Sequence, residues 1–142
     1  MKPRSNGRRG LLLWILPVII LLVLFDQVSK LFASFLLTTS CNKGIIFGIF
    51  SGGIFNSVAP LAVLLFLVYF LSGEKDRLTA MSLILIIGGG VSNLLDRIFL
   101  GCVRDFISIG FWPSFNIADS AITMGVLLLI FSLVGNLAKK ER

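Results

Sequence analysis

The sequence contains no histidine and only two cysteines among its 142 residues. Without histidine, catalytic triads built on an imidazole base are excluded, and so are most zinc sites. The two cysteines, Cys41 and Cys102, are too few and too isolated in the sequence for a metal cluster. Both fall outside the apolar segments, where a disulfide could form in an oxidising compartment. We expect instead two unpaired small apolar residues.

Charged residues are also scarce, at 14% of the chain, whereas 56% of the residues are hydrophobic. A soluble domain of this composition would aggregate, but a lipid bilayer accepts it. The net charge of +6 comes mainly from the two ends of the chain, with Lys2, Arg4, Arg8, Arg9, Lys139, Lys140 and Arg142. This distribution is typical of cytoplasmic flanks and does not predict a nucleic-acid partner.

Four apolar segments, at residues 11–35, 57–71, 78–98 and 117–137, are each near the length of a spanning helix. We therefore predict an all-α membrane protein of one domain, residues 1–142, with four transmembrane helices. Lysine and arginine are concentrated in both tails and in the loop between the second and third segments. The positive-inside rule then places both termini in the cytoplasm.

Four of the seven acidic residues are predicted to gather at one depth: Asp26, Asp96, Asp105 and Asp119. At a rise of about 1.5 Å per residue, the three that lie on helices all approach the outer boundary of a hydrocarbon core about 30 Å thick. Charges at this depth are costly to retain and usually carry function.

On the first segment, Asp26 and Lys30 are four residues apart and share one helix face. An ion pair that stabilises the end of the helix and a substrate-binding role are equally good interpretations. On the third segment, Asn93, Asp96 and Arg97 also share a face, which favours an organising network in which Arg97 keeps Asp96 ionised. The preceding glycines, 88–90, indicate close helix packing.

Asp105 and Asp119 are separated by 13 residues that include Gly110 and Pro113, enough for the chain to fold back. Two carboxyl groups brought together cannot both ionise easily, so one would act as a general acid and the other as a general base. The alternative is a solvated Asp105 and an Asp119 that caps a helix. Spacing alone favours this alternative.

Two functions without catalysis also fit four membrane helices. A proton or ion carrier should place polar groups along a path through the membrane. Here the cytoplasmic halves of the segments are almost uniformly apolar, which argues against permeation. A structural accessory protein would have no reason to retain so many polar groups in one layer.

Five short motifs resemble the family of lipoprotein signal peptidases (signal peptidase II), the bacterial membrane aspartyl proteases. They occur in the order of the family and span nearly all of the chain: DQVSK at 26–30, NKGIIFG at 42–48, NLLDR at 93–97, VRDF at 103–106 and FNIAD at 115–119. Two positions depart from the family pattern. Ser92 replaces a usual glycine and Ile46 replaces a usual small residue, which affects packing or substrate fit.

The resemblance implies a four-helix enzyme with a small extracytoplasmic β-sheet and a lid-like helical segment. It would remove the signal peptide of lipid-modified prolipoproteins just before the diacylglyceryl-modified cysteine. Asp105 and Asp119 match the catalytic pair of the family. Supporting and substrate-binding positions are matched by Asp26, Lys30, Asn42, Gly44, Asn93, Asp96, Arg97 and Asn116.

The resemblance also implies where the protein works and with what. We expect it in the bacterial cytoplasmic (inner) membrane, with its active site on the extracytoplasmic side. Its expected partners are lipid-modified prolipoproteins and membrane lipids, and we expect it to act as a monomer. The mechanism needs no metal and no organic cofactor.

Overall fold

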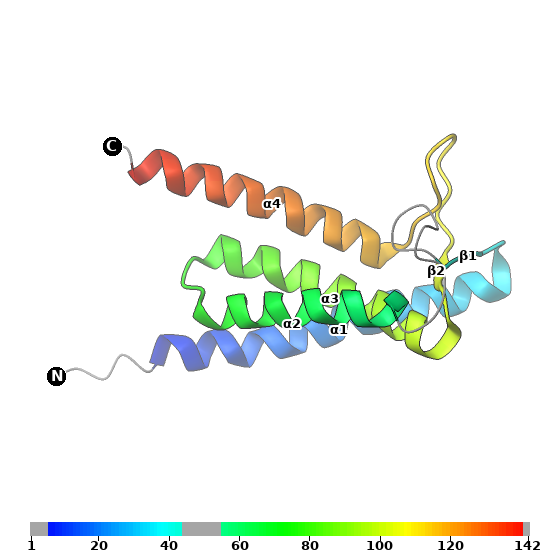
Figure 1. Ribbon diagram of the computed structural model, residues 1–142, viewed down its shortest axis with the longest axis horizontal. Coiled ribbons are helices and arrows are strands. Elements are labelled where there is room, and N and C mark those ends of the chain that lie inside the picture. Colours follow the sequence, from blue (N-terminus) through cyan, green and yellow to red (C-terminus); the bar gives the residue numbers. More distant parts are fainter. Residues whose placement is uncertain (1–5, 44–54, 141–142) are drawn as a thin grey trace.

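The computed structural model describes residues 6–43 and 55–140, which form four helices and two short strands (Figure 1). The elements are α1 (Asn6–Leu36), β1 (Ser40–Asn42), α2 (Phe55–Gly73), α3 (Arg77–Leu100), β2 (Val103–Asp105) and α4 (Ile117–Lys140). The four predicted helical segments are confirmed as helices. The described part of the chain shows no lid-like helical segment, and Gly44 and Ile46 lie outside it.

Three helices are long and apolar enough to cross a membrane, within Trp14–Leu36, Arg77–Leu100 and Ile117–Ala138. The apolar part of α2, Ser57–Gly73, is shorter. Length and composition therefore support three of the four predicted spans, and the remaining one is a short apolar helix.

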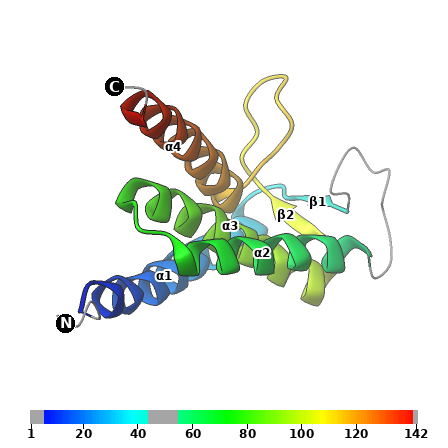
Figure 2. The same ribbon diagram turned by 60° about the vertical axis from the view of Figure 1, so that its left-hand side comes forward.

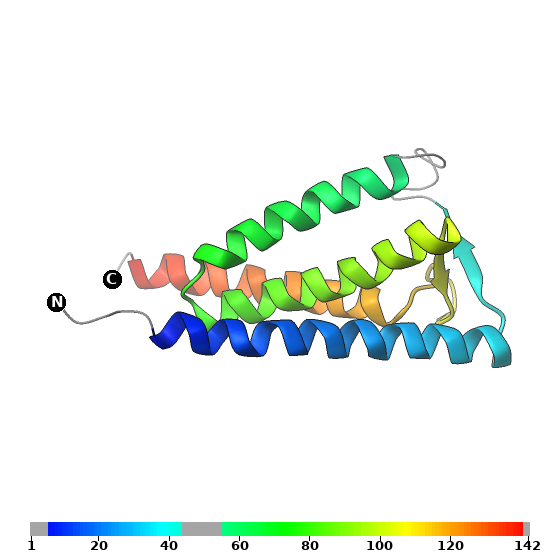
Figure 3. The same ribbon diagram turned by 90° about the horizontal axis from the view of Figure 1, so that it is seen from below.

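The helices run side by side along the long axis, and the two-stranded sheet lies at one end (Figures 1 and 3). The beginning of α1, the end of α4 and the turn between α2 and α3 lie at the opposite end (Figures 1 and 2). Helix α3 is central, because it packs against each of the other three helices and twelve of its residues are buried.

Three consecutive glycines in the middle of α3 explain this central position. A Cβ added at Gly88, Gly89 or Gly90 would meet, in turn, Leu22 of α1, Ala118 of α4 and Leu64 of α2. At Gly89 the added atom would come within 2.5 Å of a backbone oxygen, so a side chain there would push α4 away. The predicted packing role of these glycines is confirmed.

The apolar core is small, and most outward faces of the helices remain apolar. The core joins α1, α2 and α3 and consists of Ile15, Leu64, Leu71, Ala80, Leu83, Ile84, Ile87 and Leu94. Many large apolar side chains point outwards instead, among them Leu21, Phe66 and Phe131. A helix satisfies its own backbone groups, so such faces are stable against lipid and unfavourable in water.

At the end opposite the sheet, Asp76 fixes the turn between α2 and α3. Its Oδ2 accepts hydrogen bonds from the backbone N–H of Thr79 at 2.8 Å and from the hydroxyl of Ser132 at 2.9 Å. The first bond caps α3, and the second attaches α4 to the same turn.

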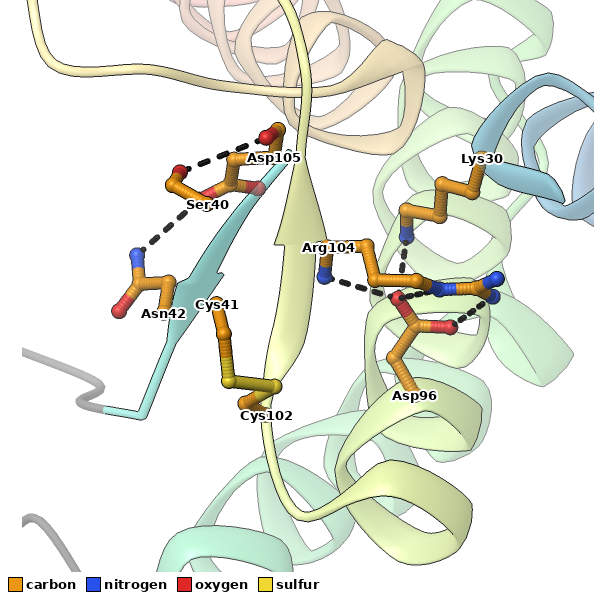
Figure 4. The surroundings of a disulfide bond; sticks show 8 residues. All are labelled: Lys30, Ser40, Cys41, Asn42, Asp96, Cys102, Arg104 and Asp105. Atoms are coloured by element: carbon orange, nitrogen blue, oxygen red, sulfur yellow. Dashed lines mark hydrogen bonds and ion pairs between the residues drawn. A yellow bond between two sulfur atoms is a disulfide. The ribbon is translucent and has the colours of Figure 1, made fainter. Parts of the chain in front are cut away.

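The sheet is an antiparallel pair in which Ser40 lies opposite Asp105 and Cys41 opposite Arg104. Gly101, with a left-handed φ of 74°, ends α3 and turns the chain towards β2. This turn brings Cys102 to Cys41, and the two form a disulfide with a Cα–Cα distance of 5.5 Å (Figure 4). Our expectation of unpaired cysteines was therefore wrong, because it ignored the strand pairing that brings the two residues together.

The disulfide closes a loop of 61 residues, so its loss should destabilise the protein. We expect Cys41→Ser with Cys102→Ser to lower the free energy of unfolding by about 2–4 kcal/mol. Thermal unfolding with and without reductant measures this: reductant should lower the midpoint of the wild type and leave the double variant unchanged. Equal midpoints for both proteins without reductant would contradict the disulfide.

Candidate active site

A buried lysine organises the polar layer at the sheet end of the bundle. The side chains of Lys30 and Asp26 are fully buried, and the Lys30 Nζ lies 2.7 Å from Asp26 Oδ2. The same nitrogen lies 3.3 Å from Asp96 Oδ2 and donates a 2.9 Å hydrogen bond to Asn93 Oδ1. Of the two interpretations of Asp26 and Lys30, the ion pair is present in the structure, and α3 contributes two more oxygen atoms to the lysine.

Asp26 also connects α1 to the beginning of α4. Its Oδ1 accepts a 2.8 Å hydrogen bond from the backbone N–H of Ala118, in the first turn of that helix. A carboxylate there satisfies an N–H group with no partner inside the helix and interacts favourably with the helix dipole. Its Oδ2 accepts a 2.6 Å hydrogen bond from the Ser92 hydroxyl. Ser92, which departs from the family pattern, therefore contributes a hydrogen bond to the polar layer as well as affecting packing.

Asp96 is paired with Arg104 rather than with Arg97, which corrects our prediction (Figure 4). Arg104 Nη2 lies 2.8 Å from Asp96 Oδ1, and the Arg104 backbone N–H donates to Asp96 Oδ2 at 3.0 Å. Gln27 completes the cluster, donating to Asp96 Oδ1 and accepting from Arg104 Nη2. The turn after α3 folds β2 back over the helix end, and this brings Arg104 to Asp96.

Arg97 lies close enough to Asp119, Asp105 and Asp96 for its guanidinium to interact with the charges of all three. Among the buried side-chain polar atoms that the structure describes, the Arg97 Nε is the one without a hydrogen-bond partner. This guanidinium therefore has capacity to bind a further acceptor next to the aspartates.

Asp105 lies at the end of β2 and is 2% exposed, so the alternative of a solvated loop residue was wrong. Its Oδ1 accepts a 2.7 Å hydrogen bond from Asn116 Nδ2, and its Oδ2 accepts a 3.3 Å bond from Asn42 Nδ2. Burial raises the pKa of the Asp105 carboxyl, and the neighbouring charge of Asp119 raises it further. The two asparagines oppose this effect in part, because their hydrogen bonds favour the ionised form.

Asp119 lies in the first turn of α4 and is half-buried. Asn116 is the residue before the helix: its Oδ1 accepts from the Asp119 N–H at 2.9 Å, and its own N–H donates to Asp119 Oδ2 at 3.1 Å. This reciprocal pair is a capping box. The predicted capping role of Asp119 is thus right, with Asn116 as its partner.

The amide groups of Asn93 and Asn116 link the buried lysine to both aspartates. Lys30 can only donate, so Asn93 turns its oxygen to Lys30 and its NH₂ group to Asp119 Oδ1, at 2.8 Å. The backbone N–H of Asp119 orients Asn116 in the same way, with its NH₂ group towards Asp105. Each aspartate therefore receives a hydrogen bond from one of these two amides, and a 3.2 Å bond from Asn116 to Asn93 joins them.

The structure brings together nearly all of the predicted site residues that it describes. Sequence reasoning did not assign Gln27, Ser92 or Arg104 to the site. The signals were present, because Gln27 and Arg104 each lie beside a predicted aspartate within a motif, and Ser92 is a departure from the family pattern. Within the described ranges, no group of three or more Asp, Glu, His or Cys residues could hold a metal ion.

The fold and the site define a small helical membrane protein with two neighbouring carboxyl groups, on β2 and α4, at one end of its bundle. A family model described as signal peptidase (SPase) II matches residues 18–135. The chain belongs to this family and is therefore a bacterial membrane protease.

Individual relatives agree with the family model. The chain is 37% identical over 140 residues to the lipoprotein signal peptidase of Syntrophomonas wolfei, an alignment that covers 87% of this chain and 94% of the relative. It is 37% identical to that of Aquifex aeolicus, over 81% of this chain and 82% of the relative. A solved structure described as a bacterial membrane enzyme matches with a TM-score of 0.81 and 29% identity, over 89% of this chain and 90% of that one.

Removing the buried lysine charge should be severely destabilising. In Lys30→Met, the carboxylates of Asp26 and Asp96 lose their shared cation inside the protein, and we expect a loss of about 3–5 kcal/mol. The matched control is Lys75→Met, in the exposed turn between α2 and α3, which should change stability by less than about 0.5 kcal/mol. Thermal or denaturant unfolding in detergent measures the stability of both variants. Equal stabilities of Lys30→Met and Lys75→Met would contradict the stabilising role of the buried lysine.

Proposed function

We propose that this protein is an aspartyl endopeptidase that removes the signal peptide of lipid-modified prolipoproteins, cutting just before the lipidated cysteine. Membership of the signal peptidase II family supports the substrate class. One observation supports the mechanism most directly: a single residue, Asn116, holds both carboxyl groups. Its side chain binds Asp105 and its backbone N–H binds Asp119.

The different surroundings of the two aspartates support different roles. Asp105 is the more buried and its pKa is raised, so we assign the proton of the pair to it. Asp119 is only half-buried, so it is the aspartate that water can reach. Asp119 is therefore the general base and Asp105 the general acid.

Hydrolysis follows from these roles. The Asp119 carboxylate takes a proton from water as the water oxygen bonds to the carbonyl carbon, and Asp105 protonates the carbonyl oxygen. When the C–N bond breaks, Asp119 gives its proton to the leaving amine, and the proton on oxygen returns to Asp105. The pair ends in its starting state, and the proposed steps use only these two carboxyl groups and water.

The remaining predicted residues serve positioning in this proposal. Asn42 holds Asp105 in place from β1. Arg97 interacts with the charges of both aspartates and helps to hold the pair at this end of α3. Gly44 contributes to the substrate site from outside the described residues.

We propose that the sheet end faces the extracytoplasmic side and that α2 crosses the membrane as a fourth span. Basic residues gather at the opposite end, which supports a cytoplasmic location for the termini. The disulfide beside β2 supports an oxidising compartment for the sheet. Helix α2 runs alongside α3 and returns the chain to the cytoplasmic end (Figure 3). All site residues that the structure describes come from a single chain, and we propose that the protein acts as a monomer.

Replacement of either aspartate should abolish cleavage. We expect Asp105→Asn and Asp119→Asn each to lower kcat at least about 100-fold, since each removes a proton-transfer group. The matched control, Asp76→Asn, makes the same change at the opposite end and keeps a residue that caps helices well. Cleavage of a diacylated precursor by purified protein measures this, and substantial activity in either site variant would refute the pair.

The raised pKa of Asp105 predicts a dependence of stability on pH. The folded state disfavours the ionised form, so Asp105 favours folding below the ordinary value of 3.8, and this contribution is lost as pH rises through the raised pKa. The Asp105→Asn side chain does not ionise, so this variant avoids the cost of burying an ionisable carboxyl group. At neutral pH its unfolding midpoint should therefore exceed that of the wild type.

The difference between the two midpoints should shrink as the pH falls to 3.8, where the wild-type carboxyl is also neutral. A difference that is independent of pH would show that Asp105 carries no such penalty.

A further inference from the structure

The connection between the two aspartates is a β-hairpin, residues 106–115. The backbone N–H of Ile107 donates to the Phe115 oxygen at 2.9 Å, and the N–H of Phe115 donates back at 3.0 Å. A further bond, from the Trp112 N–H to the Ile109 oxygen, closes the turn, and Gly110 supplies the left-handed φ of 55° that the turn requires. The tip is therefore held in place by its own backbone.

The tip presents apolar side chains that nothing in the described chain covers. Phe111 is 98% exposed, Trp112 is 64% exposed and Ile109 is 63% exposed. The whole hairpin, residues 106–115, contains no charged residue. Such a surface is unfavourable in water, so it indicates a partner.

The position of the hairpin identifies that partner. It extends sideways from the sheet end, beyond the outline of the helices and beside the beginning of α4 (Figures 1 and 2). The candidate span of α4 starts at Ile117, two residues after the hairpin ends, so the hairpin leaves the bundle at the edge of the membrane. Its tip thus lies over the lipid that surrounds the protein, and the spanning helices below it also expose apolar side chains.

We propose that Phe111 and Trp112 insert into the interfacial region of the bilayer, so that the hairpin binds the lipid surface. Aromatic side chains are enriched at this level of membranes, because the ring is apolar and the indole N–H can still reach water or headgroups. If the tip instead bound a second copy of the chain, it would not need to lie level with the membrane edge.

This anchor has a consequence for catalysis, which rests on the proposed function. Asp105 immediately precedes the hairpin, and Asn116 immediately follows it. A tip held at the interface therefore fixes the depth of both carboxyl groups relative to the lipid headgroups. The peptide bond next to a lipidated cysteine must lie at the same depth, since the acyl chains of the substrate stay in the bilayer.

The sequence offers a direct test, because Trp14 is the only other tryptophan. In Trp14→Phe, all tryptophan fluorescence comes from Trp112. In nanodiscs that hold one copy each, we expect blue-shifted emission that lipids brominated near the headgroup quench more strongly than lipids brominated near the chain end. The matched control is Trp112→Phe, which reports only on Trp14, at the start of the α1 span.

Strong quenching of Trp112 by aqueous acrylamide, without quenching by brominated lipid, would place the tip in water and overturn the proposal. Protection from both quenchers would place it against protein and would overturn the proposal as well. Neither readout depends on peptidase activity, so these outcomes are separate from a failure of the proposed function.

The catalytic consequence is tested with Phe111→Ser combined with Trp112→Ser. We expect cleavage of a diacylated precursor to fall several-fold in nanodiscs and to remain at the wild-type rate in detergent micelles, which impose no fixed depth. An equal loss of cleavage activity in nanodiscs and in micelles would show that the tip acts on folding or on the site itself. That result would overturn the proposal that the tip sets the depth of the site in the membrane.

Discussion

The arrangement of the site depends on one buried cation, Lys30, which lies between Asp26 and Asp96 and contacts Asn93. A lysine that is fully buried at a membrane boundary is expensive unless acidic groups surround it. Here the acidic groups come from α1 and α3, so the ion cluster fixes how these helices meet. Asp26 also binds the backbone N–H of Ala118 and so attaches α4 to the cluster, and Asp96 binds the backbone N–H of Arg104 and so attaches β2. One charge cluster thus positions every element that carries a proposed catalytic group.

The cluster and the proposed catalytic pair are separated by neutral amides. Asn93 and Asn116 are each oriented by a group that can only donate, and so each presents an N–H to an aspartate. This arrangement keeps Lys30 away from direct contact with Asp105 and Asp119. Direct contact with Lys30 would favour the ionised form of the carboxylate that it touched, and would oppose the shared proton that acid–base catalysis needs. The glycines of α3 complement this by letting α4, which carries Asp119, approach closely.

Local patterns in the sequence predicted the helices and the ion pair of Asp26 with Lys30, because hydrophobic runs and a spacing of four residues are properties of a single helix. The family motifs indicated supporting or substrate-binding roles for Asn42, Asn93 and Asn116, and each of them donates a hydrogen bond to Asp105 or Asp119. The errors all concern contacts made by tertiary folding. The disulfide, the pairing of Asp96 with Arg104 and the burial of Asp105 each depend on how the chain turns at Gly101 and pairs β2 with β1. No periodicity within one segment encodes that turn.

We propose that Asp105 and Asp119 share a site in which burial and mutual repulsion raise the pKa of Asp105. Infrared titration of the carboxyl bands, with the Asp105 band identified by its absence in Asp105→Asn, measures this directly. We expect a titration midpoint for that band above the ordinary aspartate value of 3.8. A midpoint at or below 3.8 would mean that Asp105 is ionised like a solvated aspartate, and it would contradict the proposed division of acid and base.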